Sequence, residues 1–482
     1  MARILLIYID INTGFFPGLH HGLASLAASV RQGGHLLKFY HLTSEDSPEA
    51  LAEEAARFSP QLIGFSVTTN QRRYLEKYSA AIYQKTKTPQ VVGGVHASVD
   101  PMDVFKIGSI QGVGIGEAER TLPGLLNKID TGEPIMEAAG FWWREQGGLI
   151  RHNAVPALEP DLSSLPYPDY SIFDIKNINA ANAGWMDMMV TRGCPYDCSY
   201  CCNHVLRSIY PSPKDYVRVS NAGHAVNIIK NNLRVYPGIK GITFSDDLLM
   251  LNEAWFKDFA DRYRREVNLP FICNARVEHL TEGVCASLKK AGCILVRIGL
   301  ESGNQWLRSY ILNRKMSNAQ ILDAFRITKK YKIPRFSYNI IGFPFETKEF
   351  MKETLALNKR IKPDMGHAYY FFPYPGTKLY SLCKEFGLLN NDEGELSGYL
   401  EHPAIRLTHC KISDCKKIYN KLRLYLLSCA ITKAFKFLPD FSAQWVYFTL
   451  NLHPQFFVDL FTKRSKLKSV MRKAAYKKML QV

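Results

Sequence analysis

The sequence predicts an α/β protein with three successive zones: a parallel sheet wound on both faces, an open β/α barrel of six strands, and a mostly helical C-terminal zone. Apolar runs alternate with helical patterns twice along the chain, which is typical of parallel strands joined by crossover helices. The length of 482 residues is enough for two or three domains. A composition of 46% hydrophobic and 22% charged residues is that of a globular protein.

The first zone, residues 1–140, contains five strand candidates separated by helical periodicity. Strands are expected at Ile4–Ile9, Leu36–Tyr40, Leu62–Val67, Val91–Gly94 and Gly112–Ile115. Helices are expected at Leu23–Gln32, Pro48–Phe58, Tyr74–Thr86 and Glu119–Ile129. Ligands of such sheets bind beyond the carboxyl ends of the strands, so the residues that follow each strand are the candidates for binding.

A linker strap over residues 141–185 separates this zone from the next. Proline and serine around Leu162–Pro168 favour an extended path over a helix. In the second zone, residues 186–388, strands are expected at Met186–Thr191, Ile239–Ser245, Phe271–Arg276, Leu295–Leu300, Phe336–Ile341 and His367–Phe372. The functional groups of a β/α barrel lie at the C-terminal ends of its strands.

Within the last zone, residues 389–482, the part from Pro403 to Val482 has 16 Lys or Arg and three Asp, so it contributes +13 to the net charge of +17. Over Lys463–Lys478 we expect a basic amphipathic helix that lies on anionic lipid, docks onto an acidic partner or is simply solvated. Aromatic residues upstream, within Trp445–Phe461, favour membrane contact or a lipid-like substrate. No nucleic-acid motif accompanies the charge, so no nucleic-acid partner is expected. The first apolar run is too short for a signal peptide and no apolar window spans a bilayer, which predicts a cytoplasmic protein, at most peripheral to the inner face of the membrane.

Three cysteines, Cys194, Cys198 and Cys201, fall in one loop after the first barrel strand. At this spacing they can present three thiolates to one face of an iron–sulfur cube, which leaves the fourth iron open for a substrate. The alternative is a zinc site completed by Cys202 or His204. Eleven cysteines without an export signal favour metal or redox chemistry over disulfides. The later cysteines, Cys410, Cys415 and Cys429, are interpreted as core residues rather than as an auxiliary cluster.

The cysteine loop, with the aromatic Tyr200 before its third cysteine, resembles the signature of the radical S-adenosylmethionine (SAM) superfamily. The resemblance implies a partial TIM-type barrel and a 4Fe-4S cluster on the three cysteines. It also implies that the open iron chelates SAM, and that an electron from a ferredoxin- or flavodoxin-type donor cleaves SAM to a 5′-deoxyadenosyl radical.

Later strand ends resemble the segments of this family that hold SAM. Taken singly, each is an ordinary strand end with a turn glycine, but their order behind the cysteine loop favours the functional interpretation. The family's usual Gly-Gly-Glu motif for the methionine ammonium is absent, and Ser245 with Asp246 would replace it. The residues that the resemblance assigns to SAM are Tyr200, Ser245, Asp246, Asn274, Arg276, Glu301 and Ile340.

The first zone resembles the Rossmann-like cobalamin-binding domain that precedes this barrel in a large subfamily. The resemblance rests on the segments Gly22–Ala27, Ser66–Thr69, Gly93–Ser98 and Gly114–Glu119. It assigns cobalamin contacts to Ser66, Thr68, Gly93, Gly94, Val95, His96, Gly116 and Glu117. A flavodoxin-like fold that binds no cobalamin is the alternative. Because the Asp-x-His-x-x-Gly motif is absent, the lower face of the cobalt is expected to be open or water-bound, with His20 and His21 as weak candidates for a ligand.

Together the two resemblances imply a methyltransferase that acts on an unactivated carbon of a small-molecule or lipid-like substrate. In this subfamily the radical removes a hydrogen from the substrate, and cobalamin supplies the methyl group. Cyclisation, anaerobic oxygenation or carbon–carbon coupling on the same scaffold, as in the chlorophyll-ring cyclase and hopanoid-type relatives, is a second hypothesis. A non-catalytic cobalamin sensor is the third.

Overall fold

The computed structural model describes residues 1–11, 18–390 and 402–436. The chain divides into a compact unit of residues 1–426 and a second unit of residues 427–482. The predicted aromatic segment and basic helix, Trp445–Phe461 and Lys463–Lys478, lie outside the described residues, so membrane contact stays a prediction. In the part of the chain that the structure describes, no helix is both long and apolar enough to cross a membrane.

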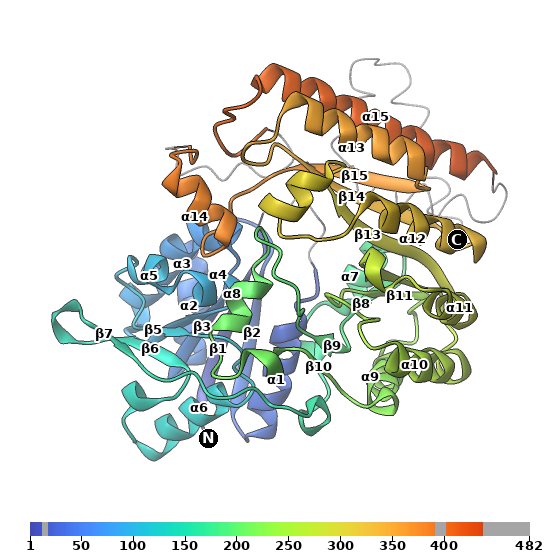
Figure 1. Ribbon diagram of the computed structural model, residues 1–482. Helices are drawn as coiled ribbons and strands as arrows, with labels where there is room; N and C mark the ends of the chain where they lie inside the picture. Colours follow the sequence, from blue (N-terminus) through green and yellow to red (C-terminus); the bar gives the residue numbers. More distant parts are fainter. Residues whose placement is uncertain (12–17, 391–401, 437–482) are drawn as a thin grey trace, which may run out of the picture. The chain divides into compact units, whose positions relative to one another are not determined.

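A seven-stranded sheet occupies the first zone, in the order β2-β1-β3-β4-β5-β6-β7 (Figure 1). Its first five strands run parallel, and β6 and β7 extend it as antiparallel strands. The strands are β1 (Arg3–Ile9), β2 (Leu36–Leu42), β3 (Leu62–Ser66), β4 (Gln90–Gly93), β5 (Gly112–Gly114), β6 (Phe141–Arg144) and β7 (Ile150–His152).

Helices cover both faces of this sheet. They are α1 (His21–Gln32), α2 (Pro48–Phe58), α3 (Arg72–Thr86), α4 (Val95–Val99), α5 (Pro101–Phe105) and α6 (Thr121–Thr131), with the short turns η1 (Thr69–Gln71), η2 (Ile135–Glu137) and η3 (Gln146–Gly148). Alternate residues of β1 explain why the strand is apolar throughout. Ile4 and Leu6 belong to the core on one face, whereas Leu5 and Ile7 belong to the core on the other.

The predicted boundary at residue 140 is too early, because β6 and β7 belong to the first sheet. Trp143 is buried there and packs beside Phe141, with ring centroids 6.0 Å apart, which gives the antiparallel extension its own core contact. The remainder of the strap is extended as predicted, apart from the turns η4 (Leu162–Ser164) and η5 (Tyr170–Ile172) and one short helix, α7 (Ile175–Ala181).

The second zone is a six-stranded parallel sheet in the order β15-β14-β13-β12-β11-β8, so each strand pairs with the next one in the chain. The strands are β8 (Trp185–Met188), β11 (Gly241–Phe244), β12 (Phe271–Ala275), β13 (Cys293–Glu301), β14 (Arg335–Ile341) and β15 (Met365–Tyr370). Strands β8 and β15 do not pair with each other among the described strands, which leaves the barrel open as predicted.

Helices follow the strands of the barrel on its outer side (Figure 1). The helices of this zone are α8 (Asn203–Ser208), α9 (Ala222–Val235), α10 (Glu253–Glu266), α11 (Glu282–Ala291), α12 (Asn318–Lys330), α13 (Lys348–Ile361) and α14 (Lys378–Glu385), followed by α15 (Ile412–Lys436). Shorter elements are β9 (Thr191–Arg192), β10 (Arg218–Val219), the turns η6 (Pro213–Tyr216) and η7 (Val277–His279), and the π-helical turn η8 (Leu307–Ile311).

One hydrophobic core runs through both zones. It joins Leu23 and Leu122 of the first zone to Ile229 and Phe244 of the barrel. Shared burial of this kind fixes the two sheets against each other without a flexible linker. The loops at the carboxyl ends of the two sheets can therefore form one site.

Candidate functional site

The three cysteines lie on the loop of residues 193–202, between β9 and α8. Gly193 opens it with a φ of +83°, and a Cβ there would lie 2.4 Å from the carbonyl oxygen of Tyr216, so only glycine fits. Ser199 fixes the other end, since its Oγ donates to the Ile311 carbonyl at 2.6 Å and its N–H donates to the Leu312 carbonyl at 3.0 Å. The loop is thus held by backbone contacts on both sides.

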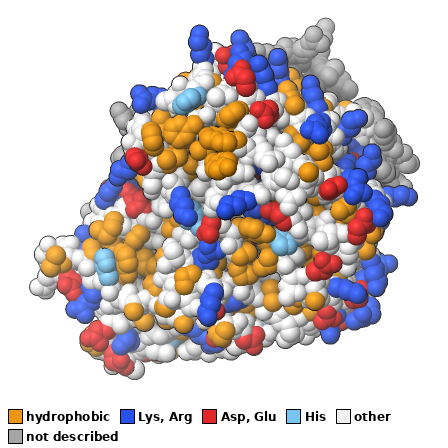
Figure 2. Space-filling model, viewed as in Figure 1, with side chains coloured by type: hydrophobic (Ala, Val, Ile, Leu, Met, Phe, Trp, Pro, Cys, Tyr) orange, Lys and Arg blue, Asp and Glu red, His pale blue; other side chains and the backbone are white. Residues whose placement is uncertain are grey.

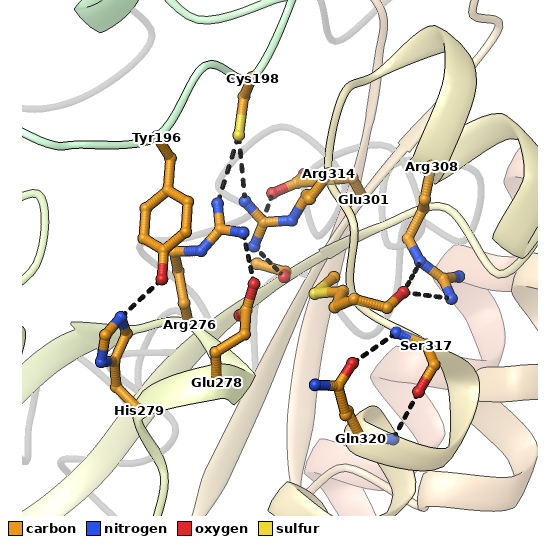
Figure 3. Close-up of polar contacts among 12 residues, drawn as sticks. Tyr196, Cys198, Arg276, Glu278, His279, Glu301, Arg308, Arg314, Ser317 and Gln320 are labelled. Atoms are coloured by element: carbon orange, nitrogen blue, oxygen red, sulfur yellow. Dashed lines mark hydrogen bonds and ion pairs between the residues drawn. The ribbon is translucent and has the colours of Figure 1, made fainter.

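Two guanidinium groups converge on the sulfur of Cys198, which is buried (Figure 3). Arg276 donates to Cys198 Sγ at 3.3 Å and Arg314 donates to the same atom at 3.8 Å. Arg276 was predicted from the end of β12, whereas Arg314 was not. Two cationic side chains therefore donate to the one sulfur.

Two neighbours, Tyr196 and Glu278, hold Arg276 in place at the end of β12 (Figure 3). Its guanidinium carbon lies 3.5 Å from the ring centroid of Tyr196, and its Nη2 donates to Glu278 Oε1 at 2.6 Å. The Tyr196 hydroxyl in turn hydrogen-bonds His279 Nε2 at 2.8 Å. The cysteine loop and the end of β12 are therefore interlocked through one arginine.

Arg314 reaches the site from the segment that follows η8. Arg308 anchors this segment, because its buried guanidinium donates to the carbonyl of Ser302 at 2.6 Å and to Asn318 Oδ1 at 2.5 Å. Arg314 donates to the Tyr200 hydroxyl at 3.4 Å and lies 3.9 Å from Glu301. Burial raises the pKa of Glu301, and Arg314 opposes that shift. Tyr200 and Glu301, which were both predicted to contact SAM, therefore lie beside Arg314.

The three cysteine thiols and the two arginines beside them fit an anionic metal–sulfur cluster. All three cysteines are free thiols, and a hydrogen bond from Cys202 together with the backbone of Asn203 lowers the pKa of Cys201 to about 7. Burial raises the pKa of Cys194 to about 11. Arg276 and Arg314, which both donate to Cys198, each keep a buried Nε that has no hydrogen-bond partner among the described residues. No three His, Cys, Asp or Glu side chains of the described part come close enough to hold a single metal ion.

The two neighbouring carboxylates at the end of β11 have different environments. Asp246 is fully buried, and its Oδ1 accepts from the N–H of Val190 at 2.9 Å and from the N–H and hydroxyl of Thr191 at 2.5 and 2.6 Å. Burial raises the pKa of Asp246 to about 6. Asp247, which was not predicted, lines a cavity and interacts electrostatically with Cys194 and Cys201. Asp246 therefore anchors β8 to β11, whereas Asp247 faces the open space.

The remaining residues predicted for SAM lie at neighbouring strand ends. Asn274 donates to the backbone carbonyl of Asp246 at 3.1 Å, and the Ser245 side chain hydrogen-bonds Asp187. Ile340 and Tyr200 both pack against the cluster that contains Phe343 and Leu307. The structure thus brings Tyr200, Arg276, Glu301 and Ile340 to the cysteine loop, while the side chains of Ser245 and Asn274 bond to the ends of β8 and β11.

A cavity of about 350 Å³ opens between the carboxyl ends of the first sheet and the cysteine loop. From the first zone it is lined by the predicted residues Ser66, Gly93, Gly94, Val95, Gly116 and Glu117, together with His20 and His21. From the barrel it is lined by residues that sequence reasoning missed, including Arg192, Tyr210, Tyr216, His224 and Asp247. Leu162, Leu165 and Tyr170 of the strap complete it.

Two residues of the cavity wall, Gly94 and Gly116, can only be glycine. Gly94 has a φ of +97°, and a Cβ there would lie 2.8 Å from the Val67 carbonyl oxygen. Gly116 has a φ of +79°, and a Cβ there would lie 2.5 Å from the Tyr210 hydroxyl. Packing against Val67 and Tyr210 therefore requires glycine at both positions, and the small residues Ser66 and Gly93 beside them leave room in the wall for a bulky ligand.

Two predicted cobalamin contacts, His96 and Thr68, are not in the cavity wall. Helix α4 begins at Val95, so His96 points to the opposite side, where its Nε2 lies 3.1 Å from Asp103. Thr68 is exposed beside η1. His20 caps α1 by accepting from the N–H of Leu23, and His21 Nδ1 hydrogen-bonds Tyr170 at 2.8 Å.

Glu117, which was predicted to touch cobalamin, is an ion-pair partner of the barrel. Arg192 Nη1 lies 2.6 Å from Glu117 and its Nη2 lies 2.6 Å from Glu119, and Arg218 bonds the other oxygen of Glu117. The N–H of Glu117 also donates to the Tyr210 hydroxyl at 2.8 Å. Because Arg192 stands two residues before Cys194, this network joins the cavity loop directly to the cysteine loop.

Fold and site together define a class of protein, in which a sheet with a ligand cavity at its carboxyl edge is joined to a partial β/α barrel with a three-cysteine loop. The models of two families match in these places: the B12 binding domain over residues 14–126 and the radical SAM superfamily over residues 188–357. The chain belongs to the cobalamin-dependent radical SAM enzymes.

Relatives and solved structures agree with this membership. An uncharacterized methyltransferase of Pyrococcus horikoshii is 27% identical over 77% of this chain and 78% of its own length. The anaerobic magnesium-protoporphyrin IX monomethyl ester cyclase of Cereibacter sphaeroides is 24% identical over 75% of this chain, which spans only 60% of that protein.

Among solved structures, the radical SAM methyltransferase TsrM from Kitasatospora setae, with cobalamin and a 4Fe-4S cluster bound, has a TM-score of 0.67 and 17% identity over 84% of this chain and 83% of its own. OxsB, with aqua-cobalamin and SAM bound, has a TM-score of 0.70 and 15% identity over 96% of this chain and 75% of its own. At these identities the likeness shows the fold, and it covers both zones.

Membership gives the cofactors. The radical SAM domain implies a 4Fe-4S cluster and SAM, and the B12 binding domain implies cobalamin.

Proposed function

We propose that the protein is a C-methyltransferase that methylates an unactivated carbon of a small-molecule or lipid-like substrate. One observation carries the proposal: the loops of the cobalamin-type sheet line a single cavity with Arg192 and Gly193, which open the cysteine loop. Reactive species can pass between two cofactors only where water and other protein groups are excluded. The methyltransferase name of the Pyrococcus relative supports the same reaction class.

The residues of this chain divide the work of the site between them. When bound, the cluster with SAM supplies one-electron cleavage chemistry, and cobalamin supplies a methyl carrier. Cys194, Cys198 and Cys201 hold the cluster, while Arg276 and Arg314 neutralise its negative charge on the side of Cys198. The Arg192 network fixes this loop relative to the cobalamin cavity.

Methyl transfer is tested with SAM that carries a trideuterated methyl group. Full-length protein reconstituted anaerobically with iron, sulfide and cobalamin is incubated with a reductant and a small-molecule extract. A C-methyltransferase yields a product whose mass has increased by one trideuterated methyl group. A product that has the same number of carbon atoms as the substrate and carries no deuterium would contradict the proposal.

A second candidate reaction, radical cyclisation or oxygenation, has a specific observation in its favour. Two of the detected relatives are named anaerobic magnesium-protoporphyrin IX monomethyl ester cyclases, at 24% and 23% identity. The labelling experiment separates the two reactions, because a cyclase changes the mass of its product without incorporating the label.

We assign the methionine ammonium of SAM to Asp247 rather than to Asp246. Asp247 lines the cavity and interacts electrostatically with Cys194 and Cys201, whereas the Oδ1 of Asp246 accepts hydrogen bonds from Val190 and Thr191. The Asp247→Asn variant should bind SAM about tenfold or more weakly, because a charge-assisted hydrogen bond is lost. Anaerobic equilibrium dialysis with labelled SAM measures the change.

Asp246→Asn is the matched variant at the neighbouring position. It should lower the melting temperature, since an amide cannot accept all three hydrogen bonds as strongly as a carboxylate does. Equal SAM affinity in Asp247→Asn and the wild-type protein would refute the assignment.

We propose that an electron donor of ferredoxin or flavodoxin type docks over η8 and α14. Figure 2 shows hydrophobic side chains gathered on this part of the surface. Trp306 is 49% exposed, Tyr310 is 75% exposed and Phe386 is 52% exposed. Leu307 and Ile311, on the same turn, pack with Tyr200 of the cysteine loop, so a donor seated here lies close to the cluster. Exposed aromatic side chains of this kind are typical of interface centres.

The double variant Trp306→Ala/Tyr310→Ala should slow cluster reduction by reduced flavodoxin at least about tenfold, the usual scale of an interface hot spot. Reduction by dithionite should not change. Stopped-flow absorbance measures both rates, with Leu149→Ala, an equally exposed site on the first zone, as the control. An unchanged flavodoxin rate in the double variant would place the docking surface elsewhere.

A further inference from the structure

Cys410 and Cys415 lie together at the start of α15, far along the chain from the cluster cysteines. Cys415 is fully buried in a small core with Ile341, Tyr370 and Tyr419, and Cys410 packs against the same core while keeping part of its surface exposed. The two thiols share a hydrogen bond. Spacing alone had indicated ordinary core residues.

This pair differs from the other hydrogen-bonded thiols among the described residues. Cys201 and Cys202 belong to the cluster loop, and Cys273 and Cys293 are both fully buried. In the Cys410 pair, by contrast, an accessible thiol outside the cluster loop lies against a buried one. That is the arrangement of a redox-active pair, in which one thiol attacks and the second resolves.

A buried carboxylate completes the arrangement. Glu346 is 1% exposed, and its Oε2 accepts from the N–H of Gly342 at 2.6 Å and of Phe343 at 3.1 Å. Its Oε1 is buried and has no hydrogen-bond partner in the described part of the chain, although the carboxylate interacts electrostatically with both Cys410 and Cys415. Nothing in the radical SAM site uses this group.

We propose that Cys410 and Cys415 are a reversible dithiol–disulfide pair that exchanges with low-molecular-weight disulfides, with Glu346 as the proton acceptor for the resolving thiol. The hydrogen bond from Cys415 lowers the pKa of Cys410, and the same bond with burial raises that of Cys415. Burial raises the pKa of Glu346 to about 8, so its carboxylate is a good base once it is ionised. Cys410 is therefore the attacking thiol.

The exchange balances in two steps. The Cys410 thiolate attacks one sulfur of the small disulfide, a mixed disulfide forms, and one small thiolate leaves. Cys415 then gives its proton to Glu346, its sulfur attacks Cys410 Sγ, and the second small thiolate leaves. Two protein thiols are oxidised to one disulfide, and the small disulfide is reduced to two thiols that take up the two protons.

The position of the pair connects it to the end of β14. A Cβ on Gly342 would lie 3.7 Å from Cys415 Sγ, so this sulfur packs directly beneath the turn that follows Ile341. Phe345 of the same turn has a φ of +62° and packs edge-on to His409, with ring centroids 5.7 Å apart. The turn is thus built against both the residue before Cys410 and the sulfur of Cys415.

The test uses the full-length, cluster-loaded protein in anaerobic glutathione buffers at pH 8. After alkylation of the free thiols and digestion with trypsin, oxidised protein should yield peptide 407–411 joined to peptide 412–416 by one disulfide. The linked pair should disappear on return to reduced glutathione. Absence of this pair at a high ratio of glutathione disulfide, or random pairing with Cys383 or Cys429, would overturn the proposal.

Glu346→Gln tests the proton acceptor separately. It should slow formation of the linked peptide at least about a hundredfold at pH 8, the lower end of what a general base contributes, without changing the final yield. Glu349→Gln, an exposed carboxylate on the adjoining helix, is the control. Equal rates in the two variants would exclude Glu346 from the exchange. Because the proposal does not depend on the substrate, failure of methyl transfer would leave it intact.

Discussion

Replacing Cys198 by alanine should reduce the cleavage of SAM to 5′-deoxyadenosine below detection. Cys198 is the buried cysteine of the loop and accepts from two guanidinium groups. Its loss removes one ligand of the cluster and leaves Arg276 and Arg314 without their shared acceptor. Anaerobic incubation with dithionite and SAM, followed by chromatography of the nucleosides, measures the effect.

Cys285→Ala is the matched control for this variant, because Cys285 is equally buried but lies on α11 among packing residues. It should keep both the cluster absorbance and the cleavage activity. Cleavage by Cys198→Ala at the wild-type rate would mean that the cysteine loop does not carry the cluster.

Arg192→Gln should lower the free energy of unfolding by about 3–5 kcal/mol, the usual cost of breaking a buried ion pair from one side. Glu119 is buried, and with Glu117 it would lose a cation 2.6 Å away. Cobalamin binding should weaken in parallel, because Glu117 and Gly116 line the cavity. Chemical denaturation and cobalamin absorbance titration measure the two effects.

Arg120→Gln provides the comparison, since its ion pair with Glu159 lies at the surface and should be worth under about 1 kcal/mol. Adding Glu119→Gln to Arg192→Gln should restore part of the stability by removing the unpaired buried charge. If Arg192→Gln were no more destabilising than Arg120→Gln, the network would not join the two zones.

Much of the fold could be predicted because parallel strands buried on both faces are long apolar runs. The five strands of the first zone and the six of the barrel occur where this pattern placed them. The first sheet was predicted too short, because Phe141–Arg144 is an antiparallel strand of only four residues. Pairing of that kind depends on tertiary contacts that a single strand does not reveal.

A backbone requirement leaves the clearest mark in the sequence. Gly94 and Gly116 are examples, because their positive φ values and close contacts exclude other residues. His96 lies outside the cavity wall because α4 begins at Val95, so Val95 and Ser98 share the cavity face and His96 does not.

Arg314 and Asp247 were missed for a different reason. Arg314 follows a π-helical turn, which no sequence period reveals, and it reaches Cys198 from a distant part of the barrel. Asp246 and Asp247 are consecutive aspartates, and only the structure shows which of the two faces the cavity. Long-range side-chain convergence of this kind depends on the packed fold.

The claim that the two cofactors share one cavity is tested most directly by electron paramagnetic resonance of the protein loaded with cob(II)alamin and a reduced cluster. Both centres are paramagnetic, so neighbouring sites predict a cob(II)alamin signal that is split or broadened when the cluster is reduced. The interaction should vanish in Cys198→Ala, which retains the cobalamin cavity. A cob(II)alamin signal that is identical with and without the reduced cluster would contradict the shared site.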